Sequence, residues 1–342
     1  MCISVEKISS GFISEQKRVT LLPIKIRDKR RELSQISNGW SRLRFEDIVI
    51  DGFRVRLFHI GGLKVGVALD IGPRILYLAL NNDQFNLFSI VPDVQIETPD
   101  GLWRIYGGHR LWTAPESFPR TYSIDDKPVS ISVDENSVVI TGNPEHQNSV
   151  LKRIRLEPGD DEYSLKVIHE VVNIGRWPIE FACWAISVMQ PGGTAVVPLK
   201  PRKIDKHGLL PDRVISVWPY TKLNDPRIKL GEDYIVVEHD QTIQAPVKIG
   251  AKANPPLAAY VVNKLLFVKQ IQPEPGRYPD HGVTVELYAN NRFLELETLS
   301  PLRIVEPGES NIHVEVWKIR KLEDYELDVQ HVVKKLFTHH ST

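Results

Sequence analysis

The chain has 342 residues and zero formal net charge, with 43 Lys and Arg against 43 Asp and Glu, so the overall balance does not support a nucleic-acid partner that would be held by phosphate neutralisation. Its two cysteines, Cys2 and Cys183, are too few for a disulfide framework or a four-cysteine zinc site. No run of about 18 apolar residues and no signal-peptide pattern is present, so we expect a soluble cytoplasmic protein that contacts no membrane.

Residues 1–42 differ from the rest of the chain. The segment Lys25–Glu32 is dense in charge and lacks strand-like alternation, whereas short apolar runs separated by turn residues become regular from Leu43 onward. We therefore expect an N-terminal extension, loosely ordered or peripheral, over residues 1–42, followed by one domain over residues 43–342. A basic arm for a membrane or nucleic acid is the functional alternative to a short solvated run of charge.

From about residue 45 to residue 320 the pattern is that of β-structure. Several segments alternate between apolar and polar residues or are rich in β-branched residues: 54–60, 63–69, 164–172, 283–288 and 311–317. Turn signals such as Asp51-Gly52, Gly61-Gly62 and Pro307-Gly308 recur at intervals that suit antiparallel hairpins. The sequence therefore predicts a mostly antiparallel β-sandwich.

The helical signal is confined to the C-terminal end. Between residues 322 and 337, apolar residues fall near helical spacing, which predicts a terminal helix that covers a sheet edge or packs onto the sandwich. No glycine-rich dinucleotide or phosphate-binding loop follows a strand, so no motif supports a nucleotide fold.

The stretch Tyr106–Glu116 combines a Gly-Gly pair with His109, Arg110 and Trp112. Glycine allows a close approach of the backbone to a ligand, Arg supplies a fork of donors, Trp offers a flat apolar face and His exchanges a proton near neutral pH. Such a mixture suits a polar cleft that binds a sugar. The structural alternative is a loop in which Arg110 pairs with Glu116, Trp112 fills the edge of the core and His109 caps a carbonyl.

Five groups of residues resemble the galactose mutarotase-like superfamily, from about residue 50 to residue 320. They are Asp70–Ile75, Asn86–Phe88, the Gly-Gly-His-Arg-Leu-Trp block at 107–112, Val172–Gly175 leading to Trp184, and Phe293–Pro301 with Pro307–Glu309. The resemblance implies a large two-sheet antiparallel β-sandwich with an open cleft on one concave sheet and a small-molecule sugar as ligand. In the enzymes it implies an acid and a base that work without a metal or an organic cofactor.

The base in that family is a Glu on a late strand, and Glu297 is the matching position. Glu295 competes with it, because two residues apart on a strand both side chains point to one face, about 6.5 Å apart. Leu294 and Leu296 would then enter the core. The alternative is that the two glutamates are solvated charges on an outer face.

The acid is where the sequence departs from the family. Mutarotases carry a His on the strand after the turn, yet the matching segment 180–186 has Trp184. His109 is the plausible match to the earlier family His, and His169 is the spare candidate. Neighbouring apolar residues favour a core or sheet-face role for His169. Trp184 could itself stack on a pyranose ring.

Further contacts are expected from Arg74 and Arg110, which would bind hydroxyls or anions, and from Trp112 as a ring platform. The segment Arg277–Gly282 offers Asp280 as a rim contact, although a turn explains its composition equally well. Lys269 would have a functional role if its side chain pointed inward and paired with Glu286 or Glu297, and none if it pointed outward.

The resulting hypothesis is an aldose 1-epimerase-like isomerase with Glu297 as base, a His acid and no metal. A binding protein of the same fold without turnover is the alternative, favoured by Trp184. A glycoside hydrolase or lyase fits less well, because Glu295 and Glu297 on one strand face cannot easily flank a glycosidic bond.

Overall fold

The computed structural model describes residues 43–323 and Val332. The extension expected over residues 1–42 lies outside the described residues. Most of the helix expected over 322–337 also lies outside the described residues. Of this segment the structure describes Leu322 and Glu323, which follow the last strand without helical structure, and Val332. Leu322 and Val332 are both buried in one small apolar cluster.

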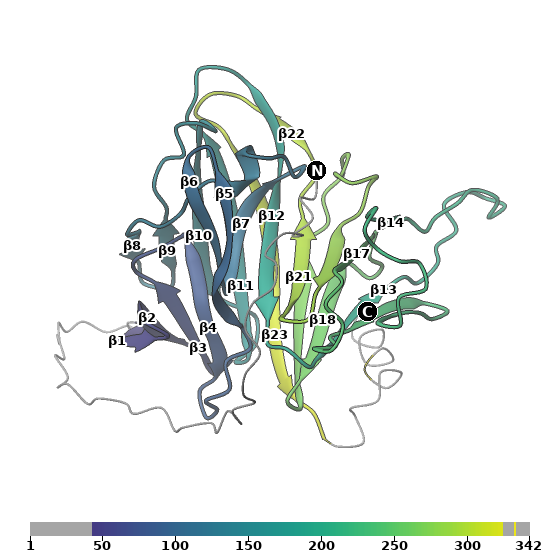
Figure 1. The fold of residues 1–342 in the computed structure, drawn as a ribbon, viewed down its shortest axis with the longest axis horizontal. Helices are drawn as coiled ribbons and strands as arrows, with labels where there is room; N and C mark the ends of the chain where they lie inside the picture. Colours follow the sequence, from purple (N-terminus) through teal and green to yellow (C-terminus); the bar gives the residue numbers. More distant parts are fainter. Residues whose placement is uncertain (1–42, 324–331, 333–342) are drawn as a thin grey trace, which may run out of the picture. The chain divides into compact units, whose positions relative to one another are not determined.

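The described residues form two large antiparallel sheets and one small one (Figure 1). The first large sheet is referred to below as the front sheet. In spatial order its strands are β1 (Arg44–Ile50), β2 (Phe53–Ile60), β3 (Leu63–Ala68), β4 (Arg74–Leu80), β7 (His109–Ala114), β12 (Ile179–Met189), β21 (Leu294–Leu299), β20 (Val285–Ala289), β17 (Val247–Ala251) and β14 (Ile215–Val217), with β22 (Arg303–Val305) paired to β12.

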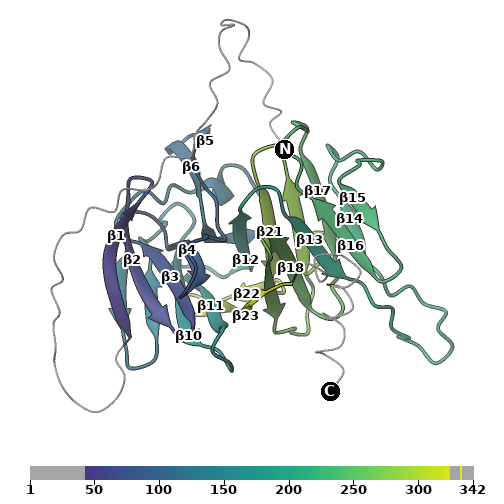
Figure 2. The same ribbon diagram turned by 90° about the horizontal axis from the view of Figure 1, so that it is seen from below.

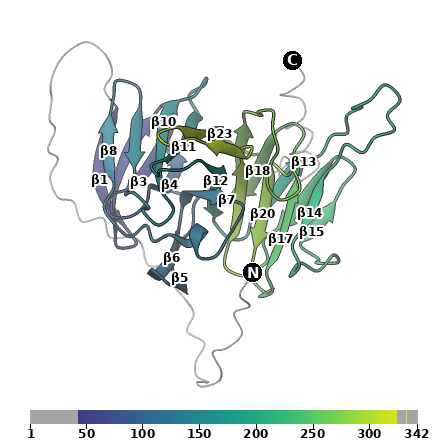
Figure 3. The same cartoon turned by 90° about the horizontal axis from the view of Figure 1, so that it is seen from above.

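The second large sheet is referred to as the back sheet, and Figure 3 shows the two as layers. Its strands in spatial order are β15 (Ile228–Leu230), β16 (Tyr234–Glu238), β13 (Thr194–Pro198), β18 (Leu257–Val262), β19 (Leu265–Ile271), β23 (Ser310–Lys321), β11 (Ser164–Asn173), β10 (Val150–Pro158), β9 (Val138–Thr141) and β8 (Ser130–Val133). The third sheet is a hairpin of β5 (Ile90–Thr98) and β6 (Gly101–Gly107), and a short 3-10 helix spans Arg120–Tyr122.

The alternation of side chains explains this architecture. In β11, buried residues alternate with half-buried ones along almost the whole strand, because successive side chains point to opposite faces. The inward residues of both sheets form one large apolar core, to which Phe58, Leu111, Phe267, Leu296 and Trp317 belong. The predicted antiparallel β-sandwich is confirmed.

The central strands of the front sheet are buried on both faces. β7, β12 and β21 have almost no exposed residue, since the back sheet covers one face and a second apolar cluster lies on the other. Trp103 and Ile105 of the β5–β6 hairpin belong to that cluster together with Trp112 and Trp184. Figures 1 and 3 show this hairpin beside β7 and β12, and Figure 2 shows it from below. We call the face away from the back sheet the outer face.

Within the described part of the chain, no helix is long and apolar enough to cross a bilayer.

Candidate active site on the outer face of the front sheet

The strand register brings distant residues into one row. Across β7, β12, β21 and β20, Arg110 is paired with Ile186, Ile186 with Glu297, and Glu297 with Glu286. Residues directly opposite each other on neighbouring strands share a face. A second row pairs Glu295 with Tyr288 and Tyr288 with Lys248 of β17. Antiparallel pairing therefore gathers charged side chains from four strands, β7, β21, β20 and β17, on the outer face.

Glu297 lies at the centre of this group and is fully buried. Its Oε2 atom accepts a hydrogen bond from the indole Nε1 of Trp184 at 2.7 Å and one from the Lys248 Nζ at 3.0 Å. Its Oε1 atom has no hydrogen-bond partner among the described residues. A buried carboxylate oxygen without a partner is costly, so this atom marks a position suited to a ligand hydroxyl or a water.

Lys248 bridges two carboxyl groups. Its Nζ lies 2.7 Å from Glu286 Oε2 and 3.0 Å from Glu297 Oε2, and it sits 4.5 Å and 4.8 Å from the ring centres of Trp184 and Trp218. Burial alone would lower the pKa of the ammonium, but the two carboxylates hold this pKa well above its usual value. Lys248 is thus a fixed positive charge in the site.

Arg110 and Glu295 form a second ion pair on the same face, with Arg110 Nη2 2.9 Å from Glu295 Oε1. The guanidinium also lies over the ring of Trp112, 4.4 Å from its centre. Burial raises the pKa of Glu295, against the opposing effect of Arg110. Within the part of the chain that the structure describes, Arg110 Nε and Nη1 have no acceptor, so two buried donors remain available beside Glu295.

Trp112 packs inside an aromatic cluster and is 7% exposed. Its ring centre lies 5.3 Å from that of Trp103, 5.2 Å from Tyr122 and 5.5 Å from Trp184. A sugar ring could therefore stack on Trp112 only if the β5–β6 hairpin or the segment carrying Tyr122 moved. The cleft that the resemblance implied is closed over this part of the sheet.

Arg74 is directly opposite Arg110 in the register but faces other partners. Its Nη1 donates to the carbonyl oxygens of Ile105 and Gly107, and its Nη2 forms an ion pair with Asp125 Oδ2 at 2.6 Å. These bonds tie the end of β6 and the segment around Asp125 to the sheet. Arg74 therefore braces the cover of the site, and its Nε has no acceptor among the described residues.

Asp280 lies at the rim rather than inside the group. It has a positive φ of 51°, and its backbone oxygen accepts a hydrogen bond from Ser216 Oγ. It lines an open groove of about 950 Å³ together with Pro115, which directly follows β7, and with Lys252 and Tyr278. The charge of Asp280 also raises the pKa of Glu286, although Glu286, Glu295 and Glu297 do not line the groove.

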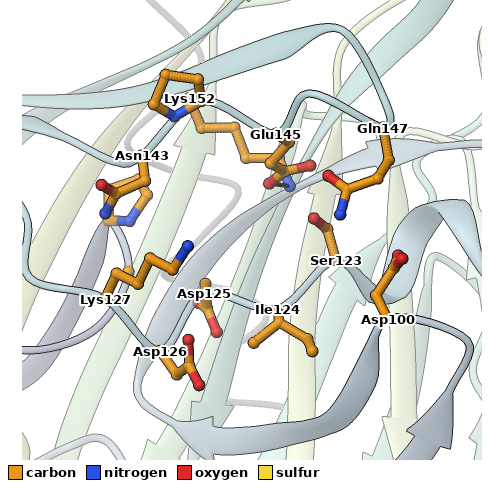
Figure 4. Close-up of a pocket in the computed structure, with 13 residues that line it drawn as sticks. Asp100, Ser123, Ile124, Asp125, Asp126, Lys127, Asn143, Glu145, Gln147 and Lys152 are labelled. Atoms are coloured by element: carbon orange, nitrogen blue, oxygen red, sulfur yellow. Dashed lines mark ion pairs between the residues drawn. The ribbon is translucent and has the colours of Figure 1, made fainter.

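A smaller cavity of about 270 Å³ lies elsewhere (Figure 4). Lys152 reaches Glu145 there, 2.6 Å away, and Asp125 lies on the opposite wall. None of the site residues expected from the sequence lines this cavity. Its link to the site is the ion pair between Asp125 and Arg74.

The structure places His109 on the other face of the sheet. Its Nδ1 is 2.9 Å from Ser187 Oγ, and its Nε2 is 2.7 Å from the Nε2 of His169 on the back sheet. Burial, with Lys269 nearby, holds the pKa of His109 well below its usual value. His109 therefore lies between the sheets as a neutral group. The sequence had led us to expect His109 beside Glu297, but the two side chains lie on opposite faces of the front sheet.

The hydrogen bonds of this interior cluster assign its protons. His169 Nδ1 donates to the carbonyl of His313, so His169 Nε2 accepts from His109, whose Nδ1 accepts from Ser187. Thr298 donates to Glu315 and accepts from His313 Nε2. The expectation that His169 is a core histidine agrees with this position.

Glu315 is the charged centre of the interior cluster. Lys269 Nζ lies 2.9 Å from its Oε1, and Trp317 Nε1 donates to its Oε2 at 2.6 Å. Lys269 thus points inward but pairs with Glu315 rather than with Glu286 or Glu297. The ligand atoms of His109, His169 and Glu315 lie within 4.8 Å of one another, a spacing that could hold a metal ion. Such an ion would have to displace the bond between the histidines and compete with the Lys269 ammonium.

Two residues of the outer-face group, Lys248 and Glu286, were not singled out by the sequence as site residues. They lie on β17 and β20; β20 pairs with β21, and β17 pairs in turn with β20. The signal that could have found them is a charged residue between inward-facing apolar neighbours, as in Val247-Lys248-Ile249 and Val285-Glu286-Leu287.

No protein-family model and no curated protein matches the sequence. Among solved structures, a candidate aldose 1-epimerase from Klebsiella pneumoniae subsp. pneumoniae is similar at a TM-score of 0.55 and 12% identity, over 86% of this chain and 87% of that one. A candidate mutarotase from Salmonella typhimurium follows with 0.52 and 12%, over 81% and 94%.

A TPR-domain containing protein from Parabacteroides distasonis is similar at a TM-score of 0.54 and 15% identity, over 81% of this chain and 49% of that one. The chain therefore spans about half the length of that protein. At these identities the likeness establishes the fold alone, which is that of the mutarotase-like proteins.

Proposed function

We propose that this protein is a carbohydrate-active isomerase that interconverts the anomers of an aldose, with Glu297 as the base. The observation that carries the proposal is the free Oε1 of Glu297, buried on the outer face while Trp184 and Lys248 hold its other oxygen. A base needs one oxygen that can take a proton and a fixed orientation, and this arrangement supplies both. The shared fold supports a sugar ligand by analogy.

The surrounding groups suit a sugar hydroxyl pattern. Arg110 Nε and Nη1 are donors without acceptors in the described residues, and Glu295 supplies a carboxylate beside them. Removing the proton from the C1 hydroxyl opens the ring, and the aldehyde then recloses on its other face. Donors that bind the remaining hydroxyls would hold the sugar chain during this rotation.

The test is anomer exchange measured by saturation-transfer NMR over a panel of aldoses. Glu297→Gln keeps the shape and the bond from Trp184 but cannot take a proton. Exchange above the spontaneous rate should therefore fall by about 10²-fold or more, with sugar affinity changed little. The matched control is Glu238→Gln, at a half-buried glutamate on β16 of the back sheet that pairs with Lys229. Wild-type protein that exchanges no aldose would refute the proposal.

A sugar-binding protein without turnover is the second candidate. The observation that favours it is the position of His109, which leaves the outer face without the His acid expected from the resemblance. In that case calorimetry would show sugar binding by a protein that leaves the exchange rate unchanged. Trp184→Ala would then weaken binding, because the indole would be missing from the site.

A further inference from the structure

Glu286 and Glu297 form a matched pair. They are directly opposite each other on β20 and β21, both are fully buried, and both face the outer side of the front sheet. Lys248 holds one oxygen of each, at 2.7 Å and 3.0 Å. The second oxygen of each, Oε1, has no hydrogen-bond partner within residues 43–323 and Val332. One lysine therefore links two buried carboxyl groups, each of which has an Oε1 that accepts no hydrogen bond from the described residues.

Ring opening needs an acid as well as a base, because the ring oxygen must receive a proton when its bond to C1 breaks. His109 is turned to the interior of the sandwich. Trp184 stands where the resemblance would put a His, and its indole N–H donates a hydrogen bond but does not give up its proton. The acid must come from another group on the outer face.

We propose that Glu286 is this acid, so that a pair of glutamates joined by Lys248 performs the isomerisation. The inference rests on the proposed function. Glu297 Oε1 takes the proton of the C1 hydroxyl, the C1–O1 bond becomes a carbonyl, the bond from C1 to the ring oxygen breaks, and the Glu286 carboxyl gives its proton to that oxygen. On closure Glu286 takes this proton back and Glu297 returns its own to O1, so both groups regain their initial states.

The charges around the pair support this assignment. One ammonium between two carboxylates leaves a buried negative charge, and a proton on one carboxyl removes it. Burial is the main cause that raises the pKa of Glu286 well above its usual value, against the opposing effect of Lys248, and the charges of Glu297 and Asp280 raise it further. The direction of this shift favours the protonated form of Glu286, which is the form that a general acid needs.

The experiment compares Glu286→Gln with wild type and with Glu238→Gln. The glutamine keeps the size of the side chain and an oxygen for Lys248 but has no carboxyl proton. We expect the exchange rate at saturating sugar to fall by about 10²-fold or more, with the sugar dissociation constant within threefold of wild type. Glu286→Asp, which keeps the carboxyl group, should retain more exchange than Glu286→Gln.

The pH profile separates an acid from a structural residue. In wild type the exchange rate, corrected for the spontaneous reaction, should fall at high pH as Glu286 loses its proton. The groups that face it are Lys248, Glu297 and Asp280, and all three remain in the variant. In Glu286→Gln the high-pH fall should vanish from the residual rate.

The outcomes distinguish the two proposals. If Glu297→Gln abolishes exchange while Glu286→Gln keeps both the wild-type rate and the high-pH fall, Glu286 is not the acid and the isomerase proposal stands. If wild type exchanges no aldose, both proposals fail. If Glu286→Gln does not fold, Glu286→Asp decides: loss of the high-pH fall in this variant would overturn the assignment, and a shifted fall would support it.

Discussion

The interior cluster predicts a specific acid sensitivity of the fold. Burial lowers the pKa of His313 to about 3, against an ordinary value of 6.5, although Glu315 beside it opposes this effect. Because this pKa is lower in the folded state, protons bind the unfolded chain more tightly, and the fold loses stability as the pH falls below about 6.5. At pH 4.5 the unfolded side chain is charged while the folded one is still neutral. The loss between pH 7 and pH 4.5 is about 2.5 kcal/mol for this group.

The measurement is the free energy of unfolding in urea for wild type and His313→Gln at both pH values. Glutamine keeps an N–H near Thr298 but does not titrate. The stability difference between wild type and variant should therefore shift by about 2.5 kcal/mol in favour of the variant at pH 4.5. Contributions from titrating groups away from His313, such as Glu286, are common to both proteins and cancel. Val167→Ala, a core truncation on β11, should keep a constant difference. A constant difference for His313→Gln would refute the reasoning.

Two further predictions concern Lys269 and Trp184. Lys269→Met should cost about 3–5 kcal/mol in urea unfolding, because it leaves Glu315 charged and buried without its cation; a cost below 1 kcal/mol would show that Glu315 is protonated instead. Trp184→Phe keeps an aromatic ring but removes the N–H that orients Glu297, so the exchange rate should fall by about 10-fold with an unchanged sugar dissociation constant. An unchanged rate would mean that Lys248 alone positions Glu297.

The strand that carries Glu297 could be predicted well from the sequence. Glu295 and Glu297 alternate with Leu294 and Leu296, and the structure places the leucines in the core and both glutamates on the outer face. Period-two alternation of charge against apolar residues is a local signal, and it fixes the face of each side chain once the segment is a strand.

The face of His109 could not be predicted in the same way. The segment His109–Ala114 is buried at every position, because the back sheet covers one side and the aromatic cluster the other. Alternation shows that His109 and Arg110 point to opposite faces, but a strand buried on both faces does not show which face holds the ligand. Only the hydrogen bonds of His109 with Ser187 and His169 show that its side chain faces the back sheet.

The partners of Glu297 depend on contacts between residues distant in sequence. Lys248 lies 49 positions before Glu297 in the chain, and Trp184 lies 113 positions before it. No local pattern links Lys248 and Trp184 to Glu297. The sequence offered Lys269 as a cation for Glu297, but Lys269 lies on a strand of the back sheet and pairs with Glu315. In a sandwich whose neighbouring strands are often far apart in sequence, local alternation predicts which face a charge occupies, whereas its partner follows from the strand order.

The replacement of a His by Trp184 therefore has a different meaning in three dimensions. By sequence alone it removes a proton donor and weakens the case for catalysis. In the structure the same indole holds Glu297 Oε2, while Lys248 draws Glu286 to the same point. A carboxyl group whose pKa is raised by burial can donate a proton that an indole cannot. Under the proposed mechanism, the loss of the His removes one acid while the neighbouring strand offers another in Glu286, and Trp184 contributes by orienting Glu297.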